Sequence, residues 1–153
     1  MEKSAKLGKL TLLNIILFGF IGQVAWAVEN NFFNTFLFSF GGTTKDISTM
    51  VAASAVVAVV TTFVMGTLSD KLGRRKVFIC AGYVAWGITV MAFAFISREN
   101  LGKLIGADPS SAAALSATVT TVIVMDCIMT FMGSTSNDSA FNAWITDVTV
   151  PSN

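Results

Sequence analysis

Long runs of apolar residues, separated by short polar breaks, dominate this chain. The first run is interrupted by Glu29, Asn30 and Asn31, and the fourth is apolar to about Met132; the helices predicted from the runs cover about residues 10–40, 47–69, 77–97 and 112–141. Each run is close to or above the ~20 residues that a helix needs to cross about 30 Å of hydrocarbon. Apolar residues follow one another without alternating with polar ones, which argues against a membrane β-barrel. The pattern predicts an all-α membrane protein with four transmembrane helices.

Composition indicates the same class of protein. Hydrophobic residues make up 54% of the 153 residues and charged residues only 12%, whereas soluble domains carry about 25% charged residues. The chain has no His, which excludes a His-ligated metal site and a His general base. We expect no metal and no cofactor. The basic residues form no continuous face, so we expect no nucleic-acid partner.

Basic residues predict the orientation of the helices. Three lysines precede the first run (residues 3–9) and four basic residues lie in the second loop (residues 71–76), while the other two loops have three together. Because cytoplasmic loops are enriched in Lys and Arg, the N-terminus is predicted to be cytoplasmic in a multi-pass protein of the cell membrane. Residues 25–27, Ala-Trp-Ala, also fit a secretory cleavage site. Since three more runs follow, we interpret the first run as a helix of the mature protein.

The most specific motif joins the second and third runs and reads Gly-Thr-Leu-Ser-Asp-Lys-Leu-Gly-Arg-Arg-Lys from position 66 to 76. Gly66 is small enough for a neighbouring helix to approach closely, and Gly73 permits a tight turn with positive φ. A carboxylate such as Asp70 should pair with a cation or a helix N-terminus at the lipid boundary. Arg74 and Arg75 can contact anionic headgroups. A simple basic anchor with an incidental Asp is the alternative interpretation.

This motif resembles the signature loop of the major facilitator superfamily, G-x-L-a-D-r-x-G-r-R, in six residues: Gly66, Leu68, Asp70, Gly73, Arg74 and Arg75. The resemblance implies a twelve-helix secondary active transporter whose two halves alternate between outward-open and inward-open states. It further implies that Asp70 and Arg74 latch these halves together on the cytoplasmic side. Residues 1–153 would then be the N-terminal part of the transporter, with the remaining helices absent.

Two other segments are similar to the glycoside–pentoside–hexuronide cation symporters and their sucrose-type relatives. Residues 22–30 are similar to their G-x-x-W-A-x-E stretch, and residues 141–149 look like Y-G-A-L-x-x-D-I-T. The resemblance implies transport of a sugar or glycoside with a cation, and it aligns Asp138 with a sugar-binding Asp. Two carboxylates of the sodium-coupled members correspond here to Ala58 and Thr62. We therefore expect proton coupling, or no coupling, rather than sodium coupling.

The first run contains a candidate substrate site. Four residues at spacings of three and four share one helical face, with Glu29 beside it: Gln23, Trp26, Asn30 and Asn34. Carboxylate and amide groups can hydrogen-bond sugar hydroxyls, and an aromatic ring can cover the C–H surface of a sugar. In the alternative interpretation the helix ends near Val28, which leaves Glu29 in the headgroup region.

Asp126 lies in the middle of the fourth run. An ionisable residue there costs at least ~2.5 kcal/mol and should face a cavity or a partner. Glu29 and Asp126 are therefore the candidates for carrying the coupled proton, although Asp126 could instead make a structural hydrogen bond to another helix.

The predicted function is sugar–cation symport by alternating access, with a sugar, a coupling cation and membrane lipid as partners. The sequence contains no recognisable nucleophile–base pair, so we do not expect an enzyme. The alternatives are a major facilitator carrier of a drug or another metabolite, and a small four-helix membrane protein with a structural role.

Overall fold

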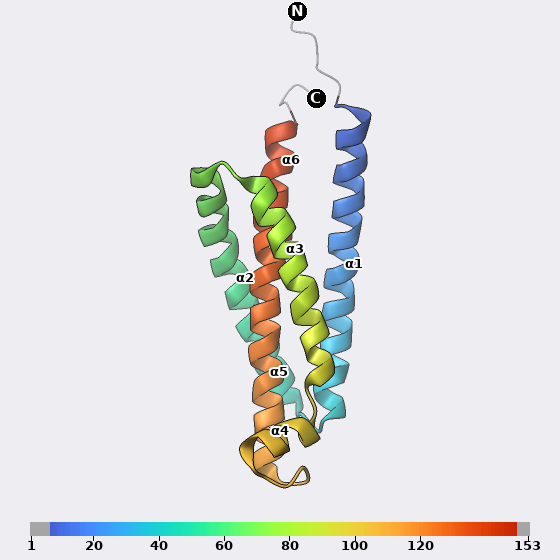
Figure 1. The fold of residues 1–153 in the computed structure, drawn as a ribbon, viewed down its shortest axis with the longest axis vertical. Coiled ribbons are helices and arrows are strands. Elements are labelled where there is room, and N and C mark those ends of the chain that lie inside the picture. Colours follow the sequence, from blue (N-terminus) through green and yellow to red (C-terminus); the bar gives the residue numbers. More distant parts are fainter. Residues whose placement is uncertain (1–6, 150–153) are drawn as a thin grey trace, which may run out of the picture.

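The computed structural model describes residues 7–149 and contains only helices and turns over that range. Four helical segments are long and apolar enough to cross a membrane (Figure 1): α1 (Lys9–Ser39), α2 (Thr44–Leu72), α3 (Arg75–Ala92) with its 3-10 extension η1 (Phe93–Phe95), and a composite segment Ala112–Val148. The prediction of an all-α chain with four such helices is confirmed. Lys3 and Lys6, which contribute to the predicted orientation, lie outside the described residues.

The composite fourth segment lies between α2 and α3 and packs against both. It consists of α5 (Ala112–Gly133), the π-helical stretch η2 (Ser134–Phe141) and α6 (Asn142–Val148), which form one continuous rod in Figure 1. About 33% of its most apolar window is buried inside the chain, against 6% for α1. Helix α1 is therefore the least enclosed of the four, and most of its apolar surface is left for lipid or other helices.

Capping residues explain where several helices begin and end. Thr43 and Asp46 form a reciprocal capping box at the start of α2, so this helix begins three residues before the predicted position 47. At its other end Gly73 has φ +60°, a left-handed conformation that glycine adopts without steric cost. The tight turn predicted at Gly73 is confirmed, and it leaves only two residues between α2 and α3.

The polar break after α3 contains a short helix that the sequence analysis missed. Helix α4 (Arg98–Ile105) lies across the end of the bundle (Figure 1). Its start is capped by the Ser97 hydroxyl, which accepts a hydrogen bond from the Asn100 N–H, and it ends at Gly106 with φ +68°. These are ordinary helix-boundary signals. The segment is too short and polar to stand out in a search for apolar runs.

The fourth helix continues past its predicted end at residue 141 into α6, and the eight residues up to that point form η2. This stretch is polar yet buried, because its hydroxyls donate to backbone carbonyls one turn back: Ser136 Oγ to Met132 O at 3.0 Å and Ser139 Oγ to Thr135 O at 2.8 Å. Such bonds satisfy buried hydroxyls inside a helix. A π-helical segment of this kind often occurs at functional sites.

Aromatic pairs connect α1 to α3. The Trp26 and Trp86 rings lie 5.2 Å apart between centroids, and the Phe33 and Phe93 rings 4.2 Å apart. Both tryptophans pack against Gly133, where an added Cβ would lie 3.1–3.2 Å from their rings. The absence of a side chain at Gly133 thus lets α1, α3 and α5 meet at one level of the bundle.

Candidate functional site

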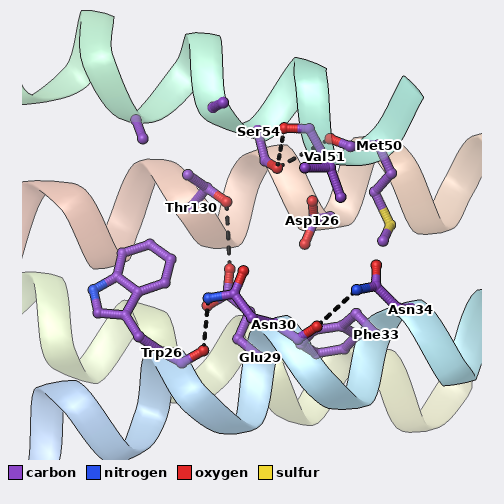
Figure 2. A pocket seen from close by; sticks show the side chains of 12 residues that line it. Trp26, Glu29, Asn30, Phe33, Asn34, Met50, Val51, Ser54, Asp126 and Thr130 are labelled. Carbon is purple, nitrogen blue, oxygen red and sulfur yellow. Dashed lines mark hydrogen bonds between the residues drawn. The ribbon is translucent and has the colours of Figure 1, made fainter. Parts of the chain in front are cut away.

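A cavity of about 180 Å³ lies between α1, α2 and α5. Figure 2 shows its side chains converging from the three helices. Its lining combines two carboxylates, four other polar side chains and six apolar ones: Trp26, Glu29, Asn30, Phe33, Asn34, Met50, Val51, Ser54, Ala55, Ala58, Asp126 and Thr130. Five of these residues come from α1, five from α2 and two from α5.

Glu29 lies in the interior of α1, which continues without a break to Ser39. The alternative in which the helix ends near Val28 is therefore wrong. Only 6% of the Glu29 surface is exposed. Its Oε1 accepts a hydrogen bond from Thr130 Oγ1 at 3.4 Å, while its Oε2 is buried and has no hydrogen-bond partner among residues 7–149. A buried carboxylate oxygen without a donor is costly, so this atom is suited to receiving one from a ligand.

Asp126 reaches the same cavity from α5 and is 4% exposed. Figure 2 shows its carboxyl group directed into the space that Glu29 borders. The ion pairs of residues 7–149 are formed by Arg75 and Lys103, both outside this cavity. Two buried carboxylates therefore share one small space without a basic side chain to balance them.

Three other polar side chains of the cavity donate hydrogen bonds to backbone carbonyls. The amide nitrogens of Asn30 and Asn34 each donate to the carbonyl oxygen four residues back, at 2.8 Å (Figure 2). The Ser54 hydroxyl donates to Met50 O at 3.0 Å. The side-chain oxygens of these residues remain able to accept, and each Asn keeps a second amide N–H, so the cavity offers both acceptors and donors.

The structure brings together most, but not all, of the predicted substrate-site residues. Trp26, Glu29, Asn30 and Asn34 line the cavity together with the predicted proton carrier Asp126. Gln23 is exposed and does not line it. The stripe with spacings of three and four thus has three members in the cavity, while Gln23, about one helical turn before Trp26, lies outside it.

Asp138 also lies outside the cavity, in η2. Its carboxylate accepts from Ser134 Oγ at 3.0 Å and from Asn137 Nδ2 at 3.2 Å, and Tyr83 donates to Asn137 Oδ1 at 3.0 Å. Gly133, with the two tryptophans packed on it, lies along the helix between Thr130 and this network. The predicted grouping of Asp138 with Glu29 is therefore replaced by two separate polar clusters.

At the α2–α3 turn, Asp70 forms an ion pair with Arg75. Arg75 Nη1 lies 2.6 Å from Asp70 Oδ1, and the same guanidinium donates through Nε and Nη2 to the carboxylate of Asp147 in α6. Arg75 is the first residue of α3, whereas Arg74 precedes it in a non-helical conformation and is exposed. Arg75 thus ties together α2, α3 and α6, and Asp70–Arg74 is not an ion pair within residues 7–149.

Two polar residues of the cavity, Ser54 and Thr130, are not among the predicted site residues. Thr130 lies one helical turn after Asp126, so it shares a face with it and could have been found from that spacing. Ser54 and Ala58 have the small-residue spacing of a close helix contact, and both line the cavity. Gly66 of the predicted latch loop faces Ser139, but an added Cβ would be 3.7 Å from the Cβ of Ser139, an ordinary contact distance, so the packing there does not require glycine.

Comparison with protein-family models, curated proteins and solved structures gave no match for this chain. The chemistry of the cavity is therefore argued from its own residues. No group of three or more His, Cys, Asp or Glu in the described part of the chain could hold a metal ion. The arrangement of two unbalanced carboxylates, several acceptor oxygens and two aromatic rings is suited to holding a proton, a cation or a small polar molecule.

Proposed function

We propose that this chain is part of a secondary active transporter of the major facilitator type that carries a sugar or glycoside together with a cation. The observation that supports this most is the cavity shared by Glu29 and Asp126, which come from α1 and α5. Both are buried within helices that can cross a membrane. Ionisable residues at such positions are costly and mark substrate or ion pathways.

In this proposal the cavity is the substrate site and works by alternating access. Trp26 and Phe33 offer ring surface to the C–H groups of a sugar, while Glu29, Asn30 and Asn34 accept hydrogen bonds from its hydroxyls. Glu29 and Asp126 are the proposed proton carriers. Proton coupling is favoured over sodium coupling because Ala58, which lines the cavity from α2, offers no ligand atom in its side chain.

The same proposal orients the molecule in the cell membrane with the N-terminus and the α2–α3 turn in the cytoplasm. Arg75 then holds Asp70 and Asp147 at the cytoplasmic end of the bundle. The exposed Arg74 is the residue of the motif left to reach the second half of the transporter. In this version of the latch, Arg75 shapes the turn and Arg74 makes the contact between halves.

The test is uptake of a labelled sugar by liposomes containing the transporter, with and without an inward proton gradient. Glu29→Gln and Asp126→Asn are expected to abolish the part of the uptake that depends on the gradient. Glu99→Gln is the matched control, because this carboxylate lies in α4 and pairs only with the exposed Lys103. Sugar uptake that is unchanged in both cavity variants would show that the site is wrongly assigned.

A further inference from the structure

We infer that the ligand of the cavity between α1, α2 and α5 carries a protonated amine. The inference deepens the proposed function and rests on it in one respect, namely that this cavity is the substrate site. It narrows the substrate to a small cationic molecule such as an amino sugar, in place of a neutral sugar. Three features of the cavity support it independently of one another: its charge, its hydrogen-bonding capacity and its aromatic walls.

The charge of the cavity is not balanced by the chain. Glu29 and Asp126 are buried and line the same cavity. The ten Lys and Arg residues all lie near the ends of the apolar runs, and none occurs within residues 10–44, 46–70, 77–97 or 104–149. A neutral ligand leaves both buried carboxylates without a positive partner, and unpaired buried charges are strongly unfavourable. One ammonium group between them offsets one of the two negative charges, and the proton of the proposed coupling neutralises the other.

The hydrogen bonds of the cavity also favour a ligand that donates. Glu29 Oε2 is buried and lacks a donor. The Thr130 hydroxyl already donates to Glu29 Oε1, and the Ser54 hydroxyl donates to the backbone. Asn30 and Asn34 each donate one amide N–H to the backbone and keep a carbonyl oxygen and a second N–H for a ligand. The donor that the cavity lacks is the one for the buried Glu29 Oε2, and a ligand can supply it. A protonated primary amine brings three donors together with a full charge, which makes each hydrogen bond stronger.

The walls of the cavity suit an organic cation better than a bare metal ion. Six of the twelve lining side chains are apolar, including the rings of Trp26 and Phe33. Aromatic faces attract ammonium groups by cation–π interaction, whereas a metal ion needs oxygen ligands on most sides. The volume of about 180 Å³ is below the about 300–1,000 Å³ of pockets for drug-sized molecules, so the ligand or its cationic end is small.

The experiment compares cationic ligands with neutral ones. Equilibrium binding of radiolabelled glucosamine, glucose, N-acetylglucosamine and ethanolamine to the detergent-purified protein is measured separately for each compound near neutral pH. N-acetylation removes the positive charge and leaves the sugar ring intact. We expect glucosamine and ethanolamine to bind about tenfold or more tightly than glucose and N-acetylglucosamine, as expected for a lost charge-assisted hydrogen bond.

Variants then locate the binding. Glu29→Gln and Asp126→Asn should each weaken glucosamine binding by about tenfold or more, while Glu99→Gln should leave it unchanged. If a cavity variant does not fold, the ligand series on the unmodified protein decides alone.

Equal binding of glucose, N-acetylglucosamine and glucosamine would overturn the inference and leave the proposed neutral-sugar function standing. Binding of ethanolamine without any sugar would support the inference and remove the sugar from the proposed function. Absence of binding by all four compounds would overturn both.

Discussion

At the scale of single residues, glycines set how closely the helices approach the polar core of the fourth segment. Gly82 of α3 faces Ser136, and Gly133 receives the Trp26 and Trp86 rings. Both positions lie inside helices, where glycine costs about 0.5–1 kcal/mol relative to alanine. Close helix contact is what offsets that cost, since small residues let backbones approach one another within a membrane.

Substituting Gly82 by Ala should therefore destabilise the bundle. The new Cβ would lie 2.6 Å from the Cβ of Ser136 and 3.2 Å from its Cα, so the α3 backbone would have to move away. We expect a loss of about 1–3 kcal/mol, the usual cost of overpacking. Gly87→Ala is the matched control in the same helix, because an added Cβ there meets nothing within 4 Å. Thermal unfolding in detergent, followed by circular dichroism, should show a lower midpoint for Gly82→Ala only; equal midpoints for the two variants would contradict the packing described here.

At the scale of elements, apolar runs and capping residues define the four long helices, and these could be predicted. Helix α4 could not, because its eight residues are too few to show a clear period. The stretch η2 lies within the predicted fourth helix, but its π-helical form and its burial could not be predicted, for another reason. Its serines and threonines are typical of a helix end in a sequence, and only their packing against α2 and α3 makes them buried.

The candidate site, too, could be predicted only in part from the sequence. Helical periodicity placed Trp26, Asn30 and Asn34 on one face, and all three line the cavity. Periodicity gives the direction of a side chain around a helix axis but not the depth at which neighbouring helices leave a space. Gln23 is grouped with Glu29 for lack of that depth, whereas Asp138 is grouped with it only through the resemblance to a sugar-binding Asp. The meeting of Glu29 with Asp126 depends on tertiary packing, which the sequence alone does not specify.

The turn between α4 and α5 provides a prediction about pH. Ser110 donates to Asp108 from its hydroxyl and, at 2.7 Å, from its backbone N–H. These two hydrogen bonds lower the pKa of the Asp108 carboxyl below its usual value. Because the folded pKa is lowered, the contribution of this turn to stability is present above the unfolded pKa and is lost as the pH falls through the folded one.

An NMR titration of the Asp108 carboxyl carbon tests this. The midpoint is expected below that of an unstructured Asp, and Ser110→Ala should move it upward, since the side-chain hydrogen bond is the larger of the two causes. Ser116→Ala, which changes a serine of α5 outside this turn, should leave the midpoint in place. A midpoint unaffected by Ser110→Ala would mean that the hydroxyl does not hold this carboxylate.

At the scale of the whole molecule, the described basic residues lie only at the ends of the bundle, whereas acidic residues lie both at the ends and in the interior. The described basic residues lie at the two ends of the bundle, while Glu29, Asp126 and Asp138 lie within the fourth segment or against it. Arg75 joins three elements at the α2–α3 end through Asp70 and Asp147. The ends can therefore sit in the headgroup regions, and the acidic interior is left to bind whatever cation enters it.

Arg75→Gln should loosen that end of the bundle. The two carboxylates are about half exposed, at 59% and 52%, so each pair contributes at most about 1 kcal/mol. We expect a small fall in the unfolding midpoint, together with faster hydrogen exchange confined to the ends of α2 and α6. Arg74→Gln, one residue away and exposed, is the control and should change neither measurement. Equal effects of the two substitutions would argue against Arg75 as the joining residue.

The separation of the two ends across a membrane can be tested by sided labelling. The α2–α3 turn and α4 lie at opposite ends of the rods in Figure 1, so Lys71→Cys and Lys103→Cys place single thiols on the two sides, after Cys80 and Cys127 are replaced by Ser. In intact cells, a membrane-impermeant maleimide should label the thiol at 103 at once and the thiol at 71 only after permeabilisation. The reverse pattern would invert the proposed orientation while keeping the four spans. Labelling of both thiols from the same side in intact cells would contradict the membrane-spanning bundle itself, because a helix as long as α3, with η1 included, separates the two positions.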